Sequence, residues 1–187
     1  LGRLTEGSAR LADMTAAEIK AVRFKASSDR ILTLGELCEL VGGRATLVLE
    51  LKSRFDGDRK LVQRVAAVLA NYAGPVAAMS FDPALVETLR TIAPGLTRGI
   101  VAERHYAHHE WDRLPPSEKR RMAHLLHAWR TRPQFVAYSV KDLPAAAPMI
   151  ARMMFGRPLL TWTVRSDDDR RRAARWADQI IFEGIRP

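Results

Sequence analysis

The sequence predicts an α/β protein built as a TIM (β/α)₈ barrel, of which about six strand–helix units are present. Short apolar strands alternate with helices along all 187 residues, and such alternation is typical of parallel strand pairing. Most strands are apolar on both faces, as strands buried on both sides are. Polar and aromatic residues gather at the carboxyl ends of the strands, where barrels of this type carry their active sites.

Helix-capping and helix-ending residues indicate the bounds of the elements. Asp82 and Pro83 together favour a helix start, because Asp caps the free amides and Pro fits the first turn. Ser166 precedes three aspartates and then arginines, an order that suits the helix dipole. The expected strands are Leu47–Leu51, Val76–Phe81, Thr97–Ala102, Phe135–Val140, Leu159–Val164 and Gln179–Glu183. The expected helices are Leu34–Val41, Arg59–Tyr72, Pro83 to about Pro94, Ser117–Arg130, Pro144–Phe155 and one that follows Ser166.

Two sheet closures are compatible with six parallel strands. A doubly wound sheet can use six, whereas a barrel needs eight, typically over ~250 residues. No glycine-rich phosphate loop follows any strand, which disfavours a nucleotide-binding doubly wound fold. We therefore expect a single barrel domain over residues 1–187 that lacks the first two strands. The opening Leu1-Gly2-Arg3 fits a chain that begins partway along its domain.

Charge and composition narrow the function classes. The net charge is +9, with clusters at Lys119–Arg121 and Arg170–Arg172 on expected helices. No aromatic residues interleave with them, so solvated helix faces are favoured over nucleic-acid binding. No apolar run approaches the ~20 residues that a membrane span requires. The single cysteine, Cys38, lies among leucines as a core thiol does, and the composition suits a cytoplasmic enzyme.

The segment Leu47–Lys52 carries the chemistry. Glu50 and Lys52 are two residues apart on a strand, so they point to the same side, ~7 Å apart along it. A carboxylate is a hard oxygen ligand suited to Mg²⁺ or Ca²⁺, and an ammonium beside it can bind phosphate. A structural ion pair explains the spacing equally well.

Four motifs, in this order, resemble the glycerophosphodiester phosphodiesterase family. That family has segments of the types L-x-R-x-T-x-G, T-x-x-E-[LI] and I-P-T-L-x-E-x-L, followed by a strand that ends in E-L-K. This chain has Leu1–Gly7, Thr15–Ile19, Ile31–Leu37 and Glu50–Lys52 at the matching places. Ser80-Phe81, the strand around Trp162 and the closing strand to Glu183 continue the resemblance along the chain. Leu32 replaces the usual Pro, and Gly2 a common Asp.

The resemblance implies roles for four residues. Glu50 resembles the third carboxylate ligand of a divalent metal, Mg²⁺ or Ca²⁺, and Lys52 the lysine that neutralises the bound phosphate. Phe81 and Trp162 resemble apolar walls near the glycerol and phosphate, although Trp162 fits core packing as well. The implied reaction is hydrolysis of a small phosphodiester to glycerol 3-phosphate and an alcohol, with two histidines as general base and acid.

The family places His-Arg-Gly on its first strand, Glu-x-Asp on its second and a His-Asp pair just before the segment that Leu1 opens. This chain begins after all three, so we expect it to be inactive alone and to bind metal poorly. The alternatives are a non-catalytic barrel relative, a basic anion-binding or nucleic-acid-binding module, and a different phosphate-processing barrel. Unpaired sheet edges would favour a homo-oligomer.

The histidine-rich segment Glu103–Glu110 resembles a metal cluster only in composition. It follows a strand as a loop and has neither a helical i, i+4 histidine pair nor a cysteine partner. We therefore expect a surface loop or the rim of an active site there. His124 and His127 are expected to be ordinary residues of an amphipathic helix.

Overall fold

The computed structural model describes residues 1–185, apart from the side chain of Ala12. The chain forms two compact units. The first contains Leu1–Ala45 and Val68–Pro75, and the second contains Thr46–Ala67 and Val76–Pro187. All six strands of the sheet belong to the second unit. Among residues 1–185, no helix is long and apolar enough to cross a bilayer.

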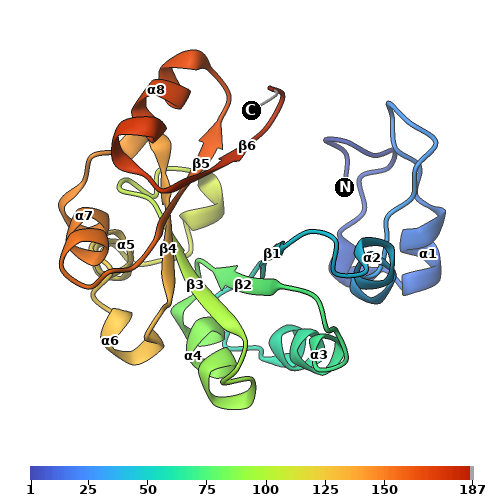
Figure 1. Ribbon diagram of the computed structural model, residues 1–187. Helices are drawn as coiled ribbons and strands as arrows, with labels where there is room; N and C mark the ends of the chain where they lie inside the picture. Colours follow the sequence, from blue (N-terminus) through green and yellow to red (C-terminus); the bar gives the residue numbers. More distant parts are fainter. Residues whose placement is uncertain (186–187) are drawn as a thin grey trace. The chain divides into compact units, whose positions relative to one another are not determined.

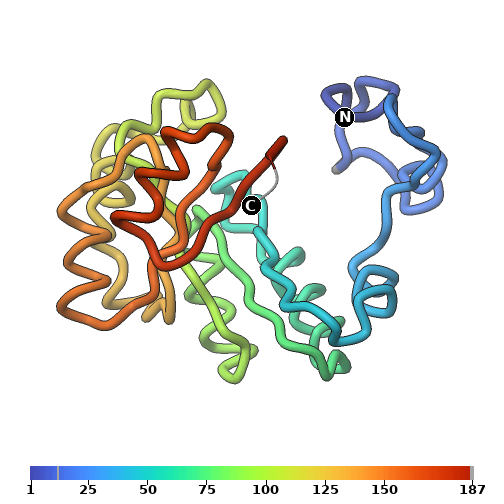
Figure 2. The backbone as a smooth tube through the Cα atoms, turned by 45° about the horizontal axis from the view of Figure 1, so that its top comes forward, coloured from blue at the N-terminus to red at the C-terminus, as the bar shows by residue number. Residues whose placement is uncertain are grey.

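Six parallel strands form one sheet in the order of the sequence (Figure 1). The strands are β1 (Leu47–Glu50), β2 (Val76–Ser80), β3 (Thr97–Ala102), β4 (Phe135–Ser139), β5 (Leu159–Val164) and β6 (Gln179–Phe182). Each strand pairs with its neighbours in the sequence, as in a barrel, and the sheet curls into a half-barrel (Figure 2). The predicted barrel class is confirmed, and the doubly wound alternative is wrong.

Helices follow the strands in turn and lie on the outer face of the sheet. They are α3 (Lys60–Leu69), α4 (Pro83–Ile92), α5 (Pro116–Ala123), α6 (Ala128–Thr131), α7 (Ala146–Met153) and α8 (Asp167–Trp176). Short 3₁₀ turns, η2 (His109–Trp111) and η3 (Val140–Asp142), follow β3 and β4. The core between helices and sheet includes Val86, Ile100, Tyr138 and Leu159.

The inner face of the sheet carries a second cluster. It comprises Ala77, Met79, Val101, Phe135 and Ala137, each at most 8% exposed. Gly99 of β3 pairs in register with Phe135 and leaves room for its ring. A Cβ at Gly99 would lie 2.3 Å from that ring, so only glycine fits there without movement. Successive side chains of a strand point to opposite faces of the sheet, so one set forms the inner cluster and the other packs against the helices.

One predicted helix is wrong. A single helix was expected over Ser117–Arg130, but α5 ends at Ala123 and α6 begins at Ala128. Leu125 between them has φ +55°, a left-handed conformation that ends a helix. Its side chain is buried in the core against the sheet, and that burial opposes the local cost of the turn. Ser117 is not the cap, because the N-cap is Pro115.

The first unit is organised by two capping boxes. Helix α1 (Ala16–Ala21) begins after Thr15, and α2 (Leu34–Val41) begins after Thr33. In each, the threonine hydroxyl and a glutamate three residues later satisfy free backbone amides reciprocally. The 3₁₀ turn η1 (Leu11–Asp13) precedes them. Cys38 of α2 is 7% exposed, as expected of a core thiol.

Candidate functional site

The carboxyl edge of β1 brings Glu50 and Lys52 together. The Lys52 ammonium donates a hydrogen bond of 2.7 Å to Glu50 Oε1. Glu50 pairs in register with Met79, which belongs to the inner cluster, so the pair stands on the inner side of the sheet. The Glu50 side chain is 29% exposed and that of Lys52 is 75% exposed. Both side chains are therefore accessible to a ligand, and the ammonium more so than the carboxylate.

The backbone beside this pair is tied to the end of β2. The amide of Leu51 donates to the carbonyl of Met79 at 2.7 Å, and the hydroxyl of Ser80 donates to the carbonyl of Leu51 at 2.7 Å. Asp82, which caps α4, accepts hydrogen bonds from the Ser53 hydroxyl and from the amide of Ala84. Lys52 lies between these anchored residues, so its Cα position is held although its side chain is exposed.

An aromatic cluster lies next to Lys52. The Phe81 ring, directly after β2, is 5.9 Å from the ammonium of Lys52. Its centroid lies 5.5 Å from that of Trp162 in β5 and 4.8 Å from that of Trp111 in η2. Tyr106 contacts both Phe81 and Trp111, with centroids 6.3 and 5.2 Å apart. The Phe81 ring thus lies near Lys52 and contacts Trp162.

Trp162 has one polar atom without a partner. Its ring nitrogen is buried and has no acceptor within the described part of the chain. Trp162 also packs on the inner cluster, so core packing and ligand contact are compatible here. A buried donor without a partner costs free energy, and the Trp111 ring nitrogen is in the same state.

A small cavity opens at the pair itself. It measures about 60 Å³ and is lined by Glu50, Lys52, Ser53, Phe81 and Glu110, with Leu51, Phe55 and Trp111 completing the wall. The walls combine one ammonium, one hydroxyl and two carboxylates with three rings. A cavity of this volume admits one small polar group.

Glu103 is a partly buried carboxylate at the carboxyl edge of the sheet to which the sequence analysis assigned no role of its own. It directly follows β3 and is half-buried beside Trp111 and Tyr106. Burial raises the pKa of the Glu103 carboxyl, and the charge of Asp142 adds to this rise. Burial likewise raises the pKa of the Tyr106 hydroxyl. The position of Glu103 after a strand was the available signal.

The histidine-rich segment, expected to be a surface loop or the rim of an active site, is a loop with one short 3₁₀ turn. His109 begins the turn η2, which buries Trp111 and so joins the loop to the aromatic cluster. His105 is exposed, with Nε2 3.8 Å from Asp142 Oδ1. His124 is exposed at the end of α5, whereas His127 precedes α6 and is buried, so the expectation of one amphipathic helix is wrong for both.

The residues present do not by themselves form a metal centre. Within residues 1–185, no group of three or more His, Cys, Asp or Glu side chains is arranged to hold an ion. Glu50 offers one carboxylate, and its Oε1 is engaged by Lys52. Ca²⁺ takes six to eight oxygen ligands, and Mg²⁺ needs an octahedral set. Glu50 is therefore at most one member of a site.

The curled parallel sheet, with polar and aromatic residues at its carboxyl edge, defines a TIM-barrel-type α/β protein. No family model and no curated protein matches the sequence. Solved structures do match. The glycerophosphoryl diester phosphodiesterase provisionally assigned in Silicibacter pomeroyi is 25% identical, with a TM-score of 0.70, over 96% of this chain and 68% of that one.

Two further structures have the same fold at lower identity. A phosphodiesterase of Oleispira antarctica, solved with the product sn-glycerol-3-phosphate, is 16% identical with a TM-score of 0.73, over 97% of this chain and 72% of that one. A glycerophosphodiester phosphodiesterase of Thermotoga maritima is 19% identical with a TM-score of 0.67, over 97% and 71%. The resemblance to the glycerophosphodiester phosphodiesterase family is thereby confirmed.

Proposed function

We propose that this chain carries part of the active site of a glycerophosphodiester phosphodiesterase, which hydrolyses a small phosphodiester to glycerol 3-phosphate and an alcohol. The observation that carries the proposal is the ammonium of Lys52 beside the carboxylate of Glu50, at the carboxyl edge of parallel strands and against the Phe81 ring. The folds of the Silicibacter pomeroyi and Oleispira antarctica structures support it.

Lys52 is the residue to which we assign charge stabilisation. Attack on a phosphodiester places extra negative charge on the phosphoryl oxygens, and a fixed ammonium lowers the barrier by neutralising it. The exposed ammonium can turn from Glu50 to a phosphoryl oxygen by side-chain rotation alone, because the backbone on either side is anchored. Phe81 and Trp162, whose rings are in contact, would exclude water from one side of the ligand.

Glu50 is the one residue of the proposed site to which we assign a divalent metal, Mg²⁺ or Ca²⁺. When bound, such an ion would supply further neutralisation of phosphoryl charge. Its remaining ligands would have to come from outside the described residues, since these contain no three-ligand group. The acid and base histidines implied by the family resemblance also lie outside the matched motifs. We therefore propose that the 187-residue chain alone has no substantial hydrolytic activity and binds metal weakly.

Binding of sn-glycerol 3-phosphate to the purified chain tests the assignment of Lys52. Titration calorimetry should give a dissociation constant that rises about tenfold in Lys52→Met, the loss of one charge-assisted hydrogen bond. Lys60→Met in α3 is the matched control, because it removes an exposed lysine away from the site. Equal affinity of Lys52→Met and the parent chain would overturn the assignment.

Hydrolysis of glycerophosphocholine, followed by release of glycerol 3-phosphate, tests the need for further residues. We expect no turnover above the uncatalysed background from the chain alone, with or without Mg²⁺ or Ca²⁺. Clear turnover that disappears in Glu50→Gln would show that the residues present suffice, and the proposed dependence on outside histidines would then be wrong.

A further inference from the structure

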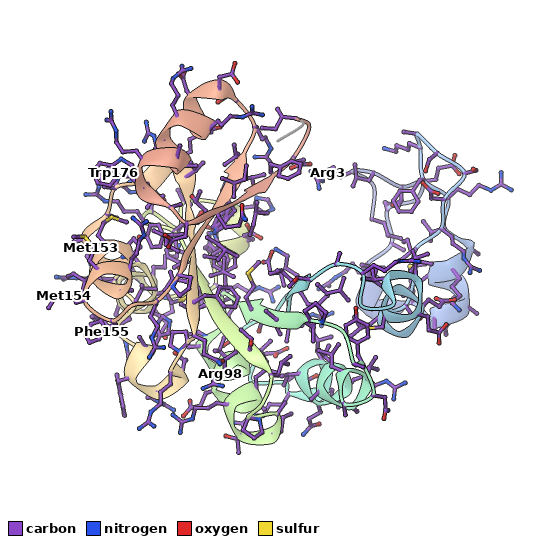
Figure 3. All side chains as sticks on the ribbon, viewed as in Figure 1. Arg3, Arg98, Met153, Met154, Phe155 and Trp176 are labelled. Atoms are coloured by element: carbon purple, nitrogen blue, oxygen red, sulfur yellow. The ribbon has the colours of Figure 1, made fainter. Side chains whose placement is uncertain are left out.

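Helices α6 and α7 expose a group of large apolar side chains on the outside of the half-barrel. Trp129 is 73% exposed, Met153 79%, Met154 74% and Phe155 67%. Figure 3 shows Met153, Met154 and Phe155 projecting outward together at the end of α7. We call these four residues the α6–α7 surface. Contiguous exposed apolar groups of this size mark an interaction site more often than they occur by chance.

A groove runs beside this surface. It measures about 510 Å³, and its floor is formed by Leu125, Val136, Ala147 and Ala151. Trp129, Ile150 and Phe155 form its apolar walls. The floor residues belong to the core against the sheet or pack on it, so the groove is a rigid feature of the fold.

The rim of the groove is positively charged. Arg132 and Arg157 line it, and none of its lining residues is acidic. Within residues 1–185, neither arginine has an acidic side chain in ion-pair distance, whereas Arg130 pairs with Glu87 at 2.8 Å. Burial lowers the pKa of Arg98, and the nearby positive charges of Arg90, Arg132 and Arg157 lower it further. Several guanidinium groups thus share this end of the sheet.

The groove lies away from the candidate active site. Arg132 precedes β4 and Arg157 precedes β5, so both stand at the amino edge of the parallel sheet. Glu50 and Lys52 stand at the carboxyl edge. A partner on the α6–α7 surface would therefore leave the candidate site open.

We propose that the α6–α7 surface docks on a lipid bilayer that contains anionic lipids. Trp, Phe and Met side chains partition into the boundary between headgroups and acyl chains, and arginines beside them bind lipid phosphates. Charge complementarity favours this occupant over a second copy of the chain. A symmetric dimer on this surface would bring two unpaired arginine rims together, each on a chain of net charge +9.

Flotation with vesicles tests the proposal. The chain should float with vesicles of phosphatidylcholine and phosphatidylglycerol, and not with phosphatidylcholine alone. Arg132→Gln and Arg157→Gln should each lower the partition coefficient about fivefold, and added salt should lower it as well. Phe155→Ser with Met153→Ser should abolish flotation. Arg64→Gln and Leu61→Ser, at exposed positions of α3, are the matched controls and should float like the parent chain.

Tryptophan fluorescence provides an independent readout. Trp129 is the most exposed of the four tryptophans, so anionic vesicles should shift the emission to the blue, and Trp129→Phe should remove that shift. Circular dichroism of each variant verifies the fold. Absence of flotation by a folded parent chain would overturn the proposal. The proposal would also be overturned if the parent chain did not bind vesicles and sedimented as a dimer that Phe155→Ser dissociates.

Discussion

At the scale of single residues, Glu50 and Lys52 form a close pair in an exposed place. An ion pair in contact with water contributes little to stability, because solvent screens the attraction and ordering two side chains costs entropy. The pair's 2.7 Å contact therefore has little structural value where it stands, with Lys52 75% exposed. A structural role for the pair predicts a loss of stability when it is replaced, whereas a functional role predicts a loss of ligand binding.

Replacing the pair should leave the fold nearly unchanged. We expect Lys52→Met and Glu50→Gln each to change the free energy of unfolding by less than about 1 kcal/mol. Urea unfolding followed by circular dichroism measures this. A loss of several kcal/mol in either variant, without a loss of sn-glycerol 3-phosphate binding, would instead indicate a structural ion pair.

His127 makes stability depend on pH. Its side chain is buried, and burial, together with the charge of Arg121, lowers its pKa to about 4 from an ordinary 6.5. In the unfolded chain it binds a proton near its ordinary pKa, so the unfolded state takes up more protons between the two values. Stability from this residue is therefore complete above about pH 6.5 and is lost as the pH falls towards 4.

The expected loss between pH 7 and pH 5 is about 2 kcal/mol for His127 alone. Urea unfolding at the two pH values, in the parent chain and in His127→Gln, isolates this contribution from those of other groups. We expect the variant to lose less stability on acidification, although it is less stable at neutral pH. Identical pH dependence in both chains would contradict the assignment.

At the scale of elements, helix starts depend on their caps. Ser166 accepts a hydrogen bond from the amide of Asp169 and begins α8, as the sequence predicted. Ser117 was predicted to cap in the same way, but it lies inside α5 and the N-cap residue Pro115 makes no side-chain hydrogen bond. The two serines therefore form a matched pair for one experiment.

Ser166→Ala should lower the free energy of unfolding by about 1 kcal/mol, because a free amide at the start of α8 loses its acceptor. Ser117→Ala should change it by less than about 0.5 kcal/mol, since alanine favours the helix interior and no cap is lost. Thermal and urea unfolding of both variants provide the comparison. Equal losses of unfolding free energy in the two variants would mean that the cap at Ser166 does not stabilise the protein.

Most strands could be predicted because their signal is local. The bounds of β3 and β5 agree with the sequence expectation, and those of the other strands differ by one residue at the carboxyl end. The break between α5 and α6 could not be predicted, because burial of Leu125 in a core assembled from distant elements outweighs its local cost. Periodicity carries no information about such a competition.

The same distinction applies to the candidate site. Glu50 and Lys52 could be placed together because strand alternation brings i and i+2 to one side. Phe81 and Trp162 could be named only from the family resemblance, and their mutual contact requires the curl of the sheet. Glu103 received no role of its own, because its burial depends on how the loop after β3 folds, and there the Glu103 amide donates to the Tyr106 hydroxyl.

At the scale of the whole molecule, the sheet has two edges. Within residues 1–185, β1 and β6 each have one strand neighbour, so both present outward-facing backbone amides and carbonyls. A closed barrel has no such edges. Val48 of β1 is 42% exposed, which leaves an apolar side chain next to one edge. These features favour pairing with another strand.

We therefore expect the purified chain to self-associate. Sedimentation velocity over a range of concentrations should show a mass that increases with concentration. Val48→Lys should reduce the association, because a charged side chain on an edge strand opposes edge-to-edge pairing. Phe155→Ser should leave the association unchanged, because Phe155 belongs to the α6–α7 surface and lies between β4 and β5, away from the β1 edge. A monomer at every concentration would contradict the expectation.

The contact between Gly99 and the Phe135 ring has a consequence for sequence variation. The Phe135 ring fills the space beside Gly99, so a larger side chain at position 99 requires a smaller one at position 135. Among homologues, we expect a larger residue at position 99 to occur together with a smaller residue at position 135. In the laboratory, the same exchange of volume across β3 and β4 should make Phe135→Leu a suppressor of Gly99→Ala.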